Sequence, residues 1–190
     1  QNLPYLHLFS HRNPLTPLPE YHNCVAKIFQ RKDESEINIP IAIITDSDVA
    51  AYKKEKKDDK EEIVKRDDSE ISSDLNDVLP RKESKYNYQS HIKAFLAKDW
   101  TFEYALYKSN VFSHAFIEIV KTIHSKTDFS NFELSLAEKL LSQSLKKTEI
   151  AYLMSNYLND KSKTASITKS QLESDDSILY LIDAIKFVCK

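Results

Sequence analysis

The sequence has no glycine among its 190 residues. The phosphate-binding loops of P-loop proteins, the dinucleotide-binding loops and the nucleophile elbow of hydrolases all depend on glycine, because a Cβ atom would clash there. These three kinds of site are therefore excluded, and a site for ATP is not expected in this sequence. Asn, Asp and Ser must form the tight turns and helix ends that glycine usually forms.

Cysteine, long apolar runs and net charge are scarce as well. Cys24 and Cys189 are far apart and lack metal-ligand spacing, so we expect reduced, buried thiols in a cytosolic protein. No signal peptide is visible, and no apolar run approaches the roughly 18 residues of a membrane helix, which predicts a cytoplasmic protein without a membrane partner. The net charge of −2 provides no global attraction to nucleic acid, which leaves only a local basic patch for such binding.

The strongest local pattern is the apolar run from Ile39 to Ile44, which ends in Thr45, Asp46 and Asp48. Such a run is typical of a strand buried on both faces of a parallel sheet. Ligands of open α/β sheets bind beyond the carboxyl ends of the strands. Two carboxylates spaced i, i+2 there would point the same way and could bind Mg²⁺ or Mn²⁺. The alternative is a strand-end turn with two solvated Asp residues.

The remaining patterns predict one α/β domain with a charged segment inside it. Residues from Tyr52 to Tyr88 are rich in Lys, Asp, Glu and Ser, which predicts a solvated or disordered insertion with a weak helix at Ser69–Leu79. A second strand is predicted at His91–Leu96, and Thr101 can cap the helix that follows. Helices are predicted at residues 1–10, 25–30, Phe102–Tyr107, Val111–Ile123, Phe132–Leu145, Thr148–Leu158 and Ser177–Cys189.

Four segments resemble, in their order and spacing, the carboxyl-terminal nuclease region of the OLD (overcoming lysogenization defect) family of ATP-dependent endonucleases. They are TDSDV (residues 45–49), AKDWTFEYAL (97–106), KKTEIAYLM (146–154) and ILYLIDAIKFVC (178–189). That region is a TOPRIM domain, so the resemblance implies a mainly parallel sheet flanked by helices and followed by a helical carboxyl-terminal part. Residues 1–52 would form its first part, 53–88 a flexible insertion, and 89–190 the remainder.

The resemblance implies a DNA endonuclease that uses two Mg²⁺ or Mn²⁺ ions. Asp46 and Asp48 match the acids that ligate the metal, and Thr45 beside them could orient a ligand or a water molecule. Glu103 matches a further acid, as metal ligand and catalytic residue. From the residue alone, Glu103 is more typical of a carboxylate favoured at a helix N-terminus.

Lys147 matches the family's catalytic lysine, which would neutralise charge on the phosphate or the leaving oxygen. Lys146 is an adjacent alternative, and a solvated lysine is the commoner interpretation of either residue. The resemblance further implies DNA as the partner, a homo-oligomer and a role in phage defence. ATP would act only through an N-terminal ABC-type ATPase domain that this sequence does not contain.

One expected acid is missing from the sequence. The family carries a glutamate at the end of its first strand, in an EGxxE motif, and here only Gln1 could match the tail of that motif. We therefore expect a fragment or an incomplete copy of the domain. Two alternatives stay open: a TOPRIM-like scaffold that has lost its chemistry, and another phosphoryl-transfer enzyme of the same fold, such as a phosphatase in which Asp46 forms a phosphoaspartate.

Overall fold

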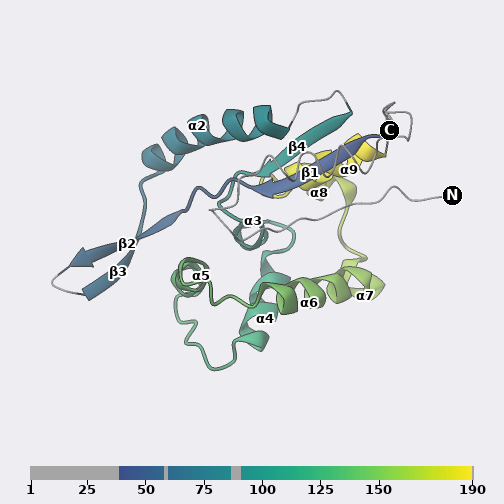
Figure 1. Ribbon diagram of the computed structural model, residues 1–190. Coiled ribbons are helices and arrows are strands. Elements are labelled where there is room, and N and C mark those ends of the chain that lie inside the picture. The colour runs from purple at the N-terminus through teal and green to yellow at the C-terminus, as the bar shows by residue number, and fades with distance from the viewer. Residues whose placement is uncertain (1–38, 58–59, 87–90, 190) are drawn as a thin grey trace, which may run out of the picture.

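The computed structural model describes residues 39–57, 60–86 and 91–189. Within these ranges the chain combines two small sheets with a series of helices, as Figure 1 shows, and the predicted α/β class is confirmed. The helices predicted within residues 1–10 and 25–30 lie outside the described residues.

The sheet that positions the site pairs β1 (Ile41–Asp46) with β4 (Ile92–Ala97) in parallel. Both strands agree with the sequence prediction, and their carboxyl ends meet because Asp46 lies opposite Ala97. Helix α9 (Leu179–Val188) packs against both strands. The side chains in this contact are apolar, and they include Ala42, Ile44, Phe95, Ala184 and Phe187. One face of the sheet is therefore covered by the last helix of the chain.

The predicted helical half of the chain is confirmed, with different ends. The helices that correspond to predicted ones are α3 (Phe102–Lys108), α4 (Ser113–Ile123), α5 (Phe132–Leu141) and α6 (Lys147–Asn159). The short α7 (Lys161–Thr164) and α8 (Lys169–Glu173) were not predicted, since their polar sequence has no apolar periodicity. Helix α5 ends four residues earlier than predicted, and Gln143 just beyond it has a left-handed backbone (φ 55°). A residue in that region cannot continue a right-handed helix.

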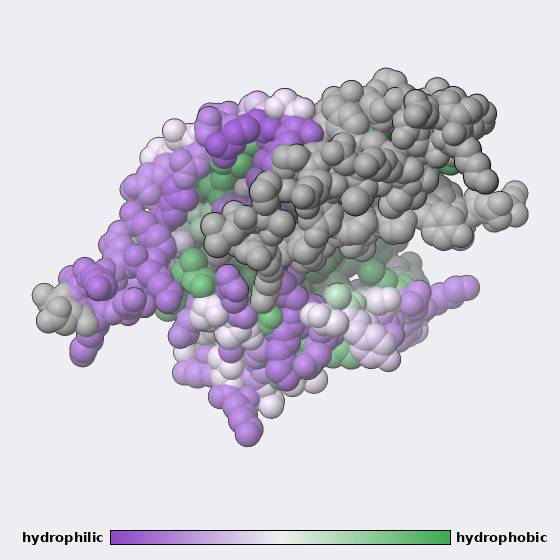
Figure 2. Space-filling view, in the orientation of Figure 1, coloured by the Kyte–Doolittle hydropathy of each residue, from purple (hydrophilic) through white to green (hydrophobic). Residues whose placement is uncertain are grey.

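The charged segment has regular structure and mostly exposed residues where it is described, which agrees with the solvated alternative and not with the disordered one. It forms a hairpin of β2 (Tyr52–Lys57) and β3 (Lys60–Lys65), followed by α2 (Asp68–Tyr86). The predicted helix at 69–79 is present within α2. Figure 2 shows hydrophilic surface over the hairpin and α2, as the composition indicates. Contacts with the rest of the domain explain the order: Tyr52 is buried in the core, and Lys65 pairs with Glu133 at 3.2 Å.

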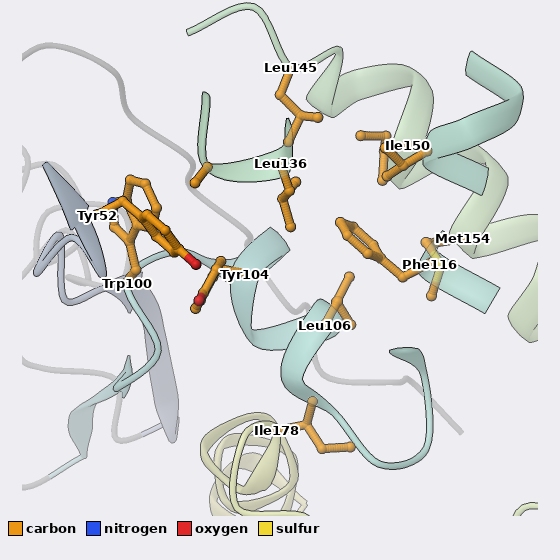
Figure 3. Close-up of a cluster of buried hydrophobic side chains, with 12 residues drawn as sticks. Tyr52, Trp100, Tyr104, Leu106, Phe116, Leu136, Leu145, Ile150, Met154 and Ile178 are labelled. Atoms are coloured by element: carbon orange, nitrogen blue, oxygen red, sulfur yellow. The ribbon is translucent and has the colours of Figure 1, made fainter. Parts of the chain in front are cut away.

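The main core joins the hairpin to the helical half. Figure 3 shows Trp100 and Tyr104 beside Tyr52 of the hairpin, with Phe116 and Ile150 further along the same cluster. The Trp100 and Tyr104 rings lie 5.5 Å apart in a tilted pair, a favourable aromatic geometry. Trp100 therefore anchors the turn after β4 in the core, which fixes the position of this turn relative to the sheet.

Asp175 is a buried carboxylate that ties the turn after α3 to the start of α9. One oxygen accepts hydrogen bonds from the Ser109 hydroxyl at 2.6 Å and the Val111 amide at 3.1 Å, and the other accepts from the Ser177 amide at 3.3 Å. Only 2% of the residue is exposed. Three donors depend on this side chain, so its role is structural.

Replacing Asp175 with Ala should lower the free energy of unfolding by about 2 kcal/mol, because buried donors would lose their acceptor. Urea unfolding followed by circular dichroism would measure the change. Asp176→Ala is the matched control, since Asp176 is exposed, and it should change stability by less than about 0.5 kcal/mol. Equal stability of the two variants would contradict the role assigned to Asp175.

The two remaining expectations concern the thiols and membrane segments. Cys189 is a free, exposed thiol at the end of α9, so the prediction of burial is wrong for this residue. Its position at a fraying helix end keeps it outside the core. Cys24 lies outside the described residues. Within residues 39–57, 60–86 and 91–189, no helix is long and apolar enough to cross a membrane.

Candidate functional site

The candidate site lies where the turns after β1 and β4 are hydrogen-bonded to each other. The Ser47 amide donates to the Ala97 carbonyl at 3.1 Å, and the Asp48 amide donates to the Trp100 carbonyl at 3.1 Å. The buried Ser47 hydroxyl also donates to the Trp100 carbonyl, at 3.4 Å. Residues about fifty positions apart in the sequence are thus held together at the carboxyl ends of two parallel strands, where α/β proteins bind ligands.

Both turns contain a residue with a left-handed backbone. Asp48 has φ 62° and Trp100 has φ 60°. Asp tolerates this region, whereas a bulky residue such as Trp is strained there, by roughly 1–3 kcal/mol. Burial of the Trp100 ring in the core holds the turn in this conformation. Residues with such backbone strain occur mostly at functional sites, which agrees with the position of these two turns. The sequence has no glycine, the residue that would adopt this conformation without strain.

Asp46 points from the end of β1 toward the start of α3. Its Oδ1 accepts a hydrogen bond from the Phe102 amide at 2.8 Å, while the Thr101 hydroxyl caps the helix by accepting from the Tyr104 amide at 3.2 Å. Burial and, to a lesser degree, the negative charge of Glu103 together raise the pKa of Asp46 to about 6, against the opposing effect of Lys147. Asp46 is therefore a carboxylate whose charge is poorly compensated.

Glu103 and Lys147 form an ion pair beside Asp46. The Lys147 ammonium donates to Glu103 Oε2 at 2.5 Å, and the Glu103 side chain is only 9% exposed. Lys147 is the first residue of α6, where the helix dipole disfavours a cation. The nearby carboxylates offset that effect. The structure thus brings together three of the residues selected from the sequence, Asp46, Glu103 and Lys147.

Asp48 has a different environment from Asp46, which corrects the expectation that the two carboxylates point the same way. Its side chain is 72% exposed, and it pairs with Lys82 of α2 at 2.6 Å. The strand alternation ends at Asp46, and the left-handed backbone of Asp48 redirects the chain. Lys82 was not selected from the sequence, because a single lysine within a charged segment has no distinguishing pattern.

Two other selected residues lie apart from the cluster. Thr45 precedes Asp46 in the strand, so its side chain is directed to the opposite face of the sheet. Lys146 is paired with Glu149 at 3.2 Å on the outer side of α6, and both side chains are more than half exposed. Of the two lysines proposed from the sequence, Lys147 is the one that reaches the acids.

Tyr180 of α9 is a neighbour of the cluster that the sequence did not indicate. Its hydroxyl is buried and has no hydrogen-bond partner within the described residues. Burial raises the pKa of Tyr180, and the charges of Asp46, Glu103 and Asp99 add to this effect. The amphipathic pattern of α9 predicted its apolar face and gave no sign that a hydroxyl on it reaches the end of β1.

The oxygen donors of the cluster suit a hard divalent cation. Among the described residues, no three His, Cys, Asp or Glu side chains gather into a metal-binding group. Asp46 and Glu103 are nevertheless adjacent carboxylates, with Asp46 Oδ2 not used by the helix amide. Mg²⁺ keeps several waters and is often bound by only one or two carboxylates together with substrate phosphates. The pair Asp46 and Glu103 therefore fits such an ion.

No protein-family model, no curated protein and no solved structure matches this chain. The geometry of the cluster, together with the sequence motifs that supply its residues, is therefore the basis for a function.

Proposed function

We propose that the chain is the nuclease part of an OLD-like ATPase-nuclease and hydrolyses phosphodiester bonds in DNA with a divalent metal ion. The observation that carries this proposal is the cluster of Asp46, Glu103 and Lys147 at the carboxyl ends of two parallel strands. Each residue belongs to a different segment that resembles the family. Their meeting in space supports a common role, because the three segments lie far apart in the sequence.

The residues have chemically distinct parts in this proposal. Asp46 and Glu103 would hold the ion, which when bound activates water and stabilises charge on the phosphate. Asp46 is ionised above pH 6 and so can serve as a ligand at neutral pH. Lys147 carries an ammonium group next to both acids and can neutralise charge on a phosphate oxygen bound there.

The proposal extends to the partners and the cellular setting. DNA would be the substrate, and ATP would act through an ABC-type ATPase domain encoded elsewhere in the same protein. The protein would form a homo-oligomer in the cytoplasm and work in phage defence. These statements follow from the family resemblance and depend on the nuclease activity itself.

Nicking of supercoiled plasmid tests the proposed reaction. The chain should convert supercoiled DNA to the open circle with Mg²⁺ or Mn²⁺, and EDTA should abolish the conversion because the carboxylates alone cannot activate water. Excess Mg²⁺ should restore it. Mn²⁺ binding without nicking would favour the scaffold alternative, and a trapped phosphoaspartate at Asp46 would favour a phosphatase-like enzyme.

A further inference from the structure

Lys82 occupies a position lined by two oxygen atoms of the DxD turn, the turn of residues 46–51. Its ammonium donates to Asp48 Oδ2 at 2.6 Å and to the main-chain carbonyl of Asp46 at 2.8 Å. Carboxylate and main-chain carbonyl oxygens are also the usual ligands of hard divalent cations. The Lys82 side chain is only 22% exposed, although most of α2 faces solvent. The ammonium is therefore held in a position that would suit a metal ion.

A second cation of the charged segment holds the other end of the same turn. The Arg66 guanidinium donates to the Ala50 carbonyl at 3.1 Å, and the Arg66 amide donates to the Ala51 carbonyl at 3.0 Å. Arg66 is itself fixed by an ion pair with Asp74 at 2.5 Å. Helix α2 also packs against β4, beside which it lies in Figure 1. The Lys82 contact thus belongs to an extended docking of α2 on the site, and is not an isolated surface ion pair.

We propose that the Lys82 ammonium takes the place of a second metal ion beside Asp48. The site then binds a single divalent ion, at Asp46 and Glu103. This inference rests on the proposed function, since it concerns the metal content of the same site. A divalent ion cannot occupy the position that the Lys82 ammonium holds between Asp48 Oδ2 and the Asp46 carbonyl, because the two cations would repel each other at contact distance. The Lys147 ammonium contacts only Oε2 of Glu103, which leaves the other oxygen of that carboxylate for an ion. Asp48 would then position Lys82 and would not ligate metal.

The charges of the cluster agree with one ion. Asp46, Asp48 and Glu103 carry three negative charges, and Lys82 and Lys147 carry two positive charges, which leaves one negative charge. One divalent ion and one phosphodiester group bring the sum to zero. A second divalent ion would leave two uncompensated positive charges while both lysines stay in place.

The number of bound ions tests this inference without reference to activity. Mn²⁺ binding to the whole chain would be counted by electron paramagnetic resonance of free Mn²⁺ and by titration calorimetry. The wild-type chain should bind one Mn²⁺ and Lys82→Met should bind two, because the substitution keeps the side-chain length and removes the charge. Lys85→Met, at an exposed lysine of the same helix, is the matched control and should bind one. Asp48→Asn should also keep one ion.

The outcomes separate this inference from the proposed function. Two ions in the wild-type chain, or loss of the single ion in Asp48→Asn, would overturn the role of Lys82 and leave a metal-dependent nuclease in place. One ion in both the wild type and Lys82→Met would likewise overturn it. No bound Mn²⁺ in any variant would reject the metal site itself, and the inference about Lys82 with it.

Discussion

Asp46→Asn should abolish metal-dependent nicking and at the same time make the fold more stable at neutral pH. Asp46 is a partly buried carboxylate next to Glu103, and both effects raise its pKa from 3.8 to about 6. The Asn side chain can still accept the hydrogen bond from the Phe102 amide, and it carries no charge. Removing a group whose pKa is raised by this amount should increase the free energy of unfolding at neutral pH by about 3 kcal/mol.

The pH dependence of this stability difference follows from the direction of the pKa shift. Between about pH 4 and pH 6 the folded chain keeps a proton on Asp46 that the unfolded chain has released. Stability of the wild type therefore falls as pH rises through this window, and the full penalty is present above pH 6. In EDTA, the free energy of unfolding of Asp46→Asn should exceed that of the wild type by about 3 kcal/mol at pH 7.5. At pH 4 the two values should be almost equal.

Urea unfolding at the two pH values, combined with plasmid nicking at pH 7.5, would measure both effects. Nicking should fall by at least about 100-fold, as expected when a group that stabilises the transition state is removed. Asp48→Asn is the matched control for stability, because Asp48 is 72% exposed, and it should shift the free energy of unfolding by less than about 1 kcal/mol. The interpretation of Asp46 would be wrong if Asp46→Asn changed stability equally at pH 4 and pH 7.5.

Lys147→Met should abolish nicking as well, with the opposite effect on stability. Lys147 is the cation paired with the buried Glu103, and it also opposes the raised pKa of Asp46. Its removal leaves two adjacent carboxylates without that charge, and loss of one partner of a buried pair costs about 3 kcal/mol. Lys146→Met removes the neighbouring exposed lysine, so nicking should persist and stability should change by less than about 1 kcal/mol.

A double variant would test whether Asp46 and Lys147 act on each other. Asp46→Asn combined with Lys147→Met removes one negative and one positive charge from the cluster. At pH 7.5 the free energy of unfolding should recover, relative to Lys147→Met alone, by more than the roughly 3 kcal/mol that Asp46→Asn adds to the wild type, because Lys147 no longer compensates Asp46. Nicking should stay absent. Additive stability changes in the four-member cycle would show that the two side chains are energetically independent, against the geometry described above.

The sequence by itself predicted the local elements of the fold well. The apolar runs indicated β1 and β4, Thr101 indicated the start of α3, and helical spacing indicated most of the later helices. These features depend on neighbours within a few residues, where side-chain periodicity and capping decide the conformation. The sequence predicted the exposure of the charged segment and a helix within it, but not its hairpin and its packing, because these depend on Tyr52, Arg66 and Lys82, whose partners lie elsewhere in the chain.

The candidate site was indicated in part. The place of Asp46 after an apolar strand indicates this residue, whereas only the family resemblance indicates Glu103 and Lys147. Considered singly, each of the latter two is more typical of an ordinary surface charge near a helix start. Their contact at 2.5 Å depends on how α3 and α6 pack around the core, which no local pattern describes.

The sequence alone determined which segments are strands and helices, and it placed Asp46 at a strand end. Only the tertiary structure decided that Asp46 lies against α3 and Glu103, that Asp48 turns outward to Lys82, and that the Tyr180 hydroxyl is buried nearby. The reason is physical. Periodicity and capping act over a few residues, whereas the charge, burial and partners of a side chain are set by segments that meet only when the chain has folded.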